Sequence, residues 1–213
     1  YYLMVAEGGT EYGHMVTYAR SKDPYGPFEA YAKNPVLTNR NLGGNENHIQ
    51  GIGHGDLIAT PYGETFMVCL GFRIQSDWMP FHHLGREVFL VPVTCDDNGW
   101  FTAGVNGTVE AVMDMPLKAD VQEMDGRYDV SFETLKREPQ RLCHLREYHP
   151  ECYAFAKNSV VLLGNRFTLN DSETPTFLGI RQSEFDTELN VGLSGNSPEA
   201  GITFYLSEEH HYD

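Results

Sequence analysis

Glu7 is a carboxylate placed where a strand should end and a turn should begin. The six residues before it (1–6) are all apolar or aromatic, which predicts a buried strand. Residues 8–10 (Gly-Gly-Thr) follow at once, and paired glycines let the backbone turn sharply and approach a ligand. A carboxyl group at the mouth of an apolar strand is partly desolvated, which favours its protonated form and suits a general acid. The alternative is a strand-end Glu7 that points into water.

A second candidate is His54, in the Gly-His-Gly-Asp motif of residues 53–56. Glycines on both sides leave no neighbouring side chains to crowd the imidazole, so the ring is predicted to face a cavity or a central channel. The alternative is a histidine that is hydrogen-bonded within a strand.

The third candidate is Arg86, which lies beside Glu87 in the motif of residues 82–87 (His-His-Leu-Gly-Arg-Glu), at the entrance to a strand. These two charged residues could form a solvated ion pair, as such neighbours usually do. Alternatively, the planar guanidinium of Arg86 binds substrate hydroxyls or a catalytic carboxylate.

The composition indicates a β-rich protein and excludes some partners. Among 213 residues there are 12 Tyr, 12 Phe and 21 Gly, a mixture that favours strands and tight turns. The net charge of −15 argues against nucleic acid and anionic membranes as partners, since both require a basic surface. No run of 18 apolar residues is present, so we predict no membrane-spanning helix.

The cysteines do not predict a metal site. Cys69 lies in an apolar strand pattern, where it should behave as a small hydrophobic residue. Cys143 and Cys152 are separated by nine positions with His144 and His149 between them, but this spacing matches no standard zinc site. Free thiols or one local disulfide are the favoured interpretations.

Hairpins dominate the chain up to about residue 113. Alternation and turn residues predict strands at 14–20, 51–60, 64–70 and 87–94, with turns at 61–63 and 96–99. No helical period interrupts them, and successive hairpins without helices indicate a sandwich, a barrel or a propeller.

Residues 114–126 are polar and are flanked by turn signals, which predicts a linker between domains. Beyond it, residues 159–164, 185–193 and 200–206 have strand-like patterns. The chain starts inside a strand and ends without a terminator, so we expect a piece of a longer protein.

Taken together, the motifs resemble family 43 glycoside hydrolases, in particular the β-xylosidase and α-L-arabinofuranosidase branch. The resemblance rests on residues 6–10 with His14, on residues 53–57 and on residues 82–90, in the family's order. Supporting motifs are found at residues 19–28, 92–94 and 97–100. Residues 177–182, 199–202 and 210–212 are similar to the β-sandwich domain appended in that branch.

This resemblance implies an all-β architecture. Residues 1–113 would be the C-terminal blades of a five-bladed catalytic β-propeller, 114–126 a linker, and 127–213 the start of a concanavalin-like β-sandwich. It also implies inverting hydrolysis of β-1,4-xylosides or α-L-arabinofuranosides, in which one carboxyl group protonates the leaving oxygen and another activates water.

The resemblance also assigns roles to residues. Glu7 matches the general acid, His54 the histidine on the propeller axis, and Arg86 the arginine that contacts the sugar or orients a catalytic carboxylate. His14 matches a position near the acid, so it is counted with the substrate-binding residues. No cofactor is required, although in some family members an ion or water is tied to the axial histidine, and a calcium ion near His54 is the corresponding prediction.

The chain departs from the family in one important respect. The general-base Asp and the Asp that tunes the acid both lie upstream of the acid in the family, and no residue precedes Tyr1 here. We therefore expect the 213-residue chain alone to be inactive. The missing blades would also leave unpaired strand edges that favour self-association into homo-oligomers.

The expected partner is a xylo-oligosaccharide or arabinoxylan. The alternative function is a non-catalytic carbohydrate-binding module or pseudoenzyme of the same fold, in which Trp78, Phe81 or Trp100 would stack on sugar rings.

Overall fold

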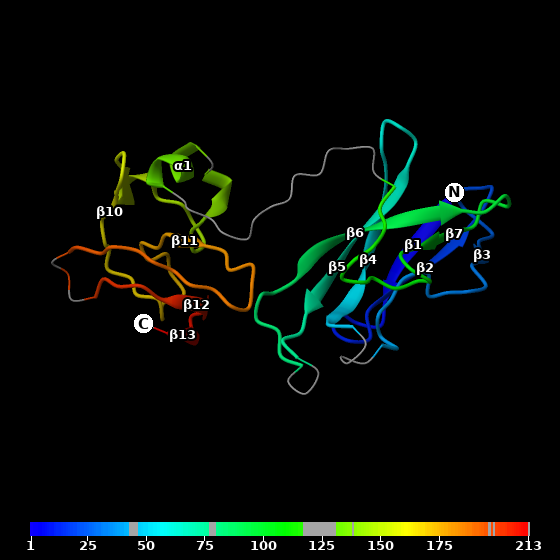
Figure 1. Ribbon diagram of the computed structural model, residues 1–213, viewed down its shortest axis with the longest axis horizontal. Coiled ribbons are helices and arrows are strands. Elements are labelled where there is room, and N and C mark those ends of the chain that lie inside the picture. The colour runs from blue at the N-terminus through cyan, green and yellow to red at the C-terminus, as the bar shows by residue number, and fades with distance from the viewer. Residues whose placement is uncertain are drawn as a thin grey trace. The chain divides into compact units, whose positions relative to one another are not determined.

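The computed structural model of the protein describes residues 1–42, 47–76, 80–116, 131–137, 139–195, 197 and 199–212. The chain divides into two compact units, Tyr1–Val121 and Gln122–Asp213 (Figure 1). Strands account for nearly all regular structure in the first unit, which contains every predicted site residue.

The first sheet of this unit is antiparallel and contains β1 (Tyr2–Glu7), β2 (Met15–Arg20) and β3 (Glu29–Ala30) in that order. Glu7 pairs with Met15 across the hairpin. Alternate residues of β2, Val16 and Tyr18, are buried, as expected for a strand with one face on a core.

The second sheet is an antiparallel meander of four strands. It contains β4 (Ile49–Ala59), β5 (Thr65–Arg73), β6 (Glu87–Cys95) and β7 (Phe101–Ala103), each paired with the next in sequence. In the turn after β6, the Asp96 carboxylate accepts hydrogen bonds from the backbone N–H groups of Asn98 and Trp100, at 2.9 and 2.8 Å. This Asx-type turn fixes the direction in which the chain enters β7.

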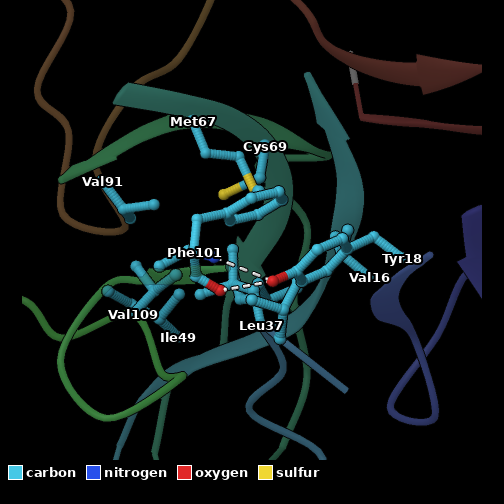
Figure 2. Close-up of a cluster of buried hydrophobic side chains, with 12 residues drawn as sticks. Val16, Tyr18, Leu37, Ile49, Met67, Cys69, Val91, Phe101 and Val109 are labelled. Atoms are coloured by element: carbon cyan, nitrogen blue, oxygen red, sulfur yellow. Dashed lines mark hydrogen bonds between the residues drawn. The ribbon is translucent and has the colours of Figure 1, made fainter. Parts of the chain in front are cut away.

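The core of the unit joins residues of both sheets (Figure 2). The Tyr18 ring stacks on Phe101 with centroids 3.9 Å apart. Its hydroxyl donates to the Phe101 carbonyl oxygen at 2.9 Å and accepts from the Phe101 N–H at 2.8 Å. Burial raises the pKa of Tyr18 to about 12, so this hydroxyl remains a donor at neutral pH.

Asn39 is a fully buried polar residue that ties three backbone groups together. Its amide nitrogen donates to the carbonyl oxygens of Ile49 and Val109, each at 2.8 Å. Its carbonyl oxygen accepts from the Val109 N–H at 2.9 Å. Asn39 thereby connects the start of β4 to the segment that follows β7, which backbone pairing alone does not join.

The second unit contains short elements. A six-residue helix, α1 (Phe132–Arg137), and the 3₁₀ turns η1 (Pro139–Arg141) and η2 (Pro150–Cys152) accompany three two-stranded ladders. The ladders pair β8 (Leu142–Cys143) with β11 (Gly179–Ile180), β9 (Tyr153–Phe155) with β10 (Val160–Leu162), and β12 (Phe204–Ser207) with β13 (His210–Tyr212).

The predicted all-β class is confirmed, because α1, η1 and η2 are the helical segments in the described parts of the chain. None of the described helices has the length and apolar character needed to cross a membrane. Residues 117–126 of the predicted linker lie outside the described residues, so the proposed domain boundaries stay a prediction.

Residues 2–7 form a strand, but the expectation of a buried strand does not hold, because β1 is an edge strand in which Tyr2, Leu3 and Val5 are each more than 40% accessible. This exposed edge agrees with the expectation of unpaired strand edges. Met4 packs against the core cluster, and the Tyr2 ring meets the Phe101 ring edge-on at 5.5 Å. The strand expected at 185–193 is wrong. Residues 185–193 form no strand and are mostly exposed, because alternation alone provides no neighbouring strand for backbone pairing.

The cysteines fit the sequence expectation. Cys69 is buried in the core, where burial raises the pKa of its thiol to about 12, and the protein's four cysteines are free thiols. Among the described residues, no group of three or more His, Cys, Asp and Glu side chains could hold a metal ion.

Candidate active site

Glu7 ends β1 and precedes a turn that requires glycine. Gly8 and Gly9 both have φ of +78°, in the left-handed region that residues with a side chain rarely adopt. A Cβ atom on Gly8 would lie 1.8 Å from the carbonyl oxygen of Gly13, so the two arms of the turn approach each other at this point. The Glu7 side chain is exposed and forms no hydrogen bond or ion pair with any residue that the structure describes.

His54 lies in β4, on a hollow of about 170 Å³ shared with β1. The hollow is lined by Met4, Val5, Ala6, His54, Gly55 and Asp56. The β1 residues in this set are the three that lead directly to Glu7. The structure therefore brings the His54 motif beside the strand that carries the predicted acid.

Irregular pairing of β4 determines how His54 is presented. The register with β5 shifts between Gln50 and Gly53 and again between Gly53 and Asp56, and His54 itself has φ of +52°. Such bulges redirect a side chain relative to a regular strand and are frequent beside active sites.

The glycines beside His54 have a further role that the sequence did not predict. A Cβ atom on Gly53 would lie 2.3–2.4 Å from the ring atoms of His14, and one on Gly55 would lie 2.6 Å from the Met67 sulfur. These glycines therefore accept neighbouring side chains against the strand backbone. The expectation that they leave His54 uncrowded stays a prediction.

His14 is buried beneath β4, with only 3% of its surface accessible. Its Nδ1 is 3.1 Å from the Gly51 carbonyl oxygen, a hydrogen bond in which the ring nitrogen donates. The Thr38 hydroxyl donates to the His14 backbone carbonyl at 2.8 Å. His14 thus lies in the interior of the unit, under the strand that presents His54.

Replacing Gly53 by alanine should destabilise the protein, because the new methyl group would overlap the His14 ring. Overpacking of this kind costs about 1–3 kcal/mol in the free energy of unfolding. Urea denaturation of the full-length protein would measure the loss. Gly164→Ala is the control, since no atom lies within 4 Å of its Cβ position. If Gly53→Ala cost as much with His14→Ala as without it, the overlap with the ring would not be the cause.

Arg86 contacts the turn that follows Glu7. Its Nη2 donates to the carbonyl oxygen of Thr10 and lies 3.5 Å from the Glu11 carboxylate. The neighbouring Glu87 pairs instead with Arg73, in a two-point contact of 2.8 and 2.9 Å across β5 and β6. Arg86 and Glu87 therefore do not form the ion pair that was one of the two predictions for these neighbours.

The three sequence motifs thus meet around β1. Residues just before Glu7 lie against His54, and residues just after it are bound by Arg86. Sequence reasoning missed Glu11 and His82, whose side chains approach each other at 3.6 Å beside Arg86. A charged residue directly after a glycine turn was the available signal for Glu11.

The aromatic residues considered for sugar stacking are in different surroundings. Phe81 is 67% exposed. The ring of Trp100 is covered by the Arg20 guanidinium, 3.6 Å from its centroid, so one face is occupied. Trp78 lies outside the described residues.

The surroundings of His54 do not by themselves make a calcium site. Calcium takes about six to eight oxygen ligands. Asp56 is the one carboxylate among the residues that line the hollow. A calcium ion at this position stays a prediction from the family resemblance.

Comparison with known proteins identifies similar sequences. Residues 1–101 match the family model described as Glycosyl hydrolases family 43. The chain is 35% identical to the non-reducing end alpha-L-arabinofuranosidase BoGH43B of Bacteroides ovatus and 30% identical to a xylosidase/arabinosidase of Butyrivibrio fibrisolvens. Both matches include all of this chain, which spans 40% and 42% of the two relatives.

Solved structures of GH43 proteins are also similar to this chain. The Bacteroides ovatus xyloglucan PUL GH43B structure superposes with a TM-score of 0.75 at 35% identity, over 87% of this chain and 36% of that one. The GH43 BlXynB protein of Bacillus licheniformis superposes with a TM-score of 0.71 at 27% identity, over 86% of this chain and 35% of that one.

Proposed function

We propose that this chain, whose residues 1–101 match the model of Glycosyl hydrolases family 43, is part of a longer inverting glycosidase. The enzyme removes terminal β-1,4-xylosyl or α-L-arabinofuranosyl groups from plant hemicellulose, such as xylo-oligosaccharides or arabinoxylan. Relatives named xylosidase/arabinosidase and alpha-L-arabinofuranosidase support this substrate class. The observation that carries the proposal is the meeting of the His54 and Arg86 motifs around the strand that ends at Glu7.

In this proposal Glu7 is the general acid. Its carboxyl proton passes to the glycosidic oxygen as the bond from that oxygen to the anomeric carbon breaks, while a water molecule attacks the anomeric carbon from the opposite face and gives its proton to the general base. The general base is an Asp in the part of the enzyme outside this chain, about 6.5–9.5 Å from Glu7, which leaves room for the water. The Gly8–Gly9 turn places no side chain beside the carboxyl group.

The other residues bind or support the substrate. His54 lines the hollow between β1 and β4, where its imidazole can hydrogen-bond a sugar hydroxyl or an ordered water. Arg86 lies against the Glu7 turn and presents further N–H donors for a hydroxyl or a carboxylate. His14 supports the bulged part of β4 through its hydrogen bond to the Gly51 carbonyl oxygen.

The same proposal includes the finer architecture. The β4–β7 meander has the form of a propeller blade, namely four antiparallel strands in sequence order. We assign it and the β1–β3 sheet to a five-bladed propeller, and the second unit to part of a concanavalin-like sandwich.

An activity assay of the full-length protein tests the function. We expect it to release 4-nitrophenol from the β-xyloside or the α-L-arabinofuranoside, and proton NMR should show the inverted anomer as the first product. The 213-residue chain alone should be inactive, because it lacks the base. Sugar binding by the full-length protein without turnover would instead identify a carbohydrate-binding module, and retention of configuration would contradict the inverting mechanism.

A further inference from the structure

Three successive residues after the glycines, Thr10, Glu11 and Tyr12, contact residues 80–86, the segment that leads into β6. Arg86 donates to the Thr10 carbonyl oxygen. The Glu11 carboxylate lies between His82 and Arg86, with its two oxygens 3.6 Å from Nε2 and 3.5 Å from Nη2. The Tyr12 hydroxyl donates to the Pro80 carbonyl oxygen at 2.7 Å. The two segments are thus joined at several points, with Glu11 in the middle.

Two of these residues pack on a buried aromatic side chain. Phe72, which is fully buried, stacks on the His82 ring with centroids 3.9 Å apart. Tyr12 meets the same phenyl ring edge-on at 5.3 Å. Burial and the nearby Glu11 charge raise the pKa of Tyr12, which keeps its hydroxyl protonated as a donor. The Phe72 ring therefore holds one residue from each segment in place.

The turn is the hairpin loop between β1 and β2, and it is held at both ends. Glu7 pairs with Met15, Gly8 lies close against Gly13, and the His14 N–H donates to the Glu11 carbonyl oxygen at 3.0 Å. Gly9 at the tip has no atom within 4 Å of its Cβ position, and glycine has the widest backbone freedom of all residues. The contacts of Thr10, Glu11 and Tyr12 therefore fix how the tip of this loop lies on residues 80–86.

We propose that Glu11 is a positioning residue of the glycosidase. By binding Arg86 and His82 together, Glu11 fixes the glycine turn on the Pro80–Arg86 segment and so orients both Glu7 and Arg86 toward the substrate. The inference rests on the proposed function of Glu7. Glu11 itself touches no reacting atom.

The expected effect is on catalysis and not on stability. Glu11 is 63% exposed in its side chain, and exposed ion pairs contribute little to folding. Misplacement of a catalytic group by about 1 Å can nevertheless cost up to about 10²-fold in rate. The two readouts therefore separate a positioning role from a structural one.

The test uses Glu11→Gln and Glu11→Ala in the full-length protein, assayed on a glycoside with a poor leaving group and on the 4-nitrophenyl glycoside. We expect kcat to fall about tenfold on the poor leaving group. The loss on the 4-nitrophenyl substrate should be smaller, because it needs less protonation, and the thermal midpoint should not change. Glu110→Gln is the matched control, an exposed carboxylate that changes the net charge equally.

The outcomes separate this inference from the function on which it rests. If Glu7→Gln abolishes the acid step but Glu11→Gln behaves like Glu110→Gln, the positioning role is wrong and the function stands. If Glu11→Gln lowers the thermal midpoint and reduces both substrates equally, Glu11 is structural and the inference is also overturned. If Glu7→Gln has no effect on the poor leaving group, the assignment of the acid is wrong.

Discussion

Replacement of Glu7 by glutamine in the full-length protein should lower kcat by about 10²–10⁴-fold on substrates with poor leaving groups. General acid catalysis contributes a factor of this order, and glutamine keeps the shape of the side chain but has no transferable proton. Steady-state hydrolysis of xylobiose or of an alkyl glycoside would measure the loss.

The leaving group provides the internal control for this variant. The 4-nitrophenyl glycoside should lose much less activity, because its leaving group departs with little protonation. Glu29→Gln, which changes an exposed carboxylate on β3 of the same sheet, should leave both rates near the wild type. An equal loss on both substrates would instead mean that Glu7 positions the sugar and is not the acid.

Replacement of Asn39 by alanine should lower the free energy of unfolding by about 2–5 kcal/mol. The change leaves the Ile49 carbonyl oxygen and the Val109 N–H without their partner in the interior, while the Val109 carbonyl oxygen keeps the hydrogen bond from the Asn47 amide at 2.6 Å. Each buried polar group left unpaired costs about 1–3 kcal/mol. Urea denaturation of the full-length protein, followed by circular dichroism, would measure the change.

A second asparagine serves as the control for stability. Asn98 is exposed in the turn before β7, and Asn98→Ala should alter the free energy of unfolding by no more than about 0.5 kcal/mol. A loss for Asn39→Ala no greater than that of Asn98→Ala would show that water replaces the amide.

The local pattern of the sequence determined where most strands of the first unit lie. Residue patterns on either side of the turn at 61–63 and before the turn at 96–99 predicted strands at 51–60, 64–70 and 87–94, close to β4, β5 and β6. Strand formation at these positions depends on neighbouring residue types, which sequence displays directly. The family resemblance had the same origin, since it rested on short motifs in a fixed order.

The three motifs also identified most of the candidate site before its geometry was known. Glu7, His54 and Arg86 were selected from their residue types and flanking glycines, and the structure places their motifs around β1. Their roles in catalysis stay predictions. Local sequence sufficed here because a site carried by strand ends and tight turns leaves glycines and charges at fixed positions beside it.

Only the tertiary structure decided which residues are partners. Glu87 pairs with Arg73 across two strands and not with the adjacent Arg86, and Gly53 is small because His14 packs on it from a distant turn. The exposure of β1 followed from its place at the edge of a sheet, although its residues are as apolar as those of a buried strand. Burial, pairing and close approach depend on residues far apart in the chain, and the order of residues along one segment carries no record of them.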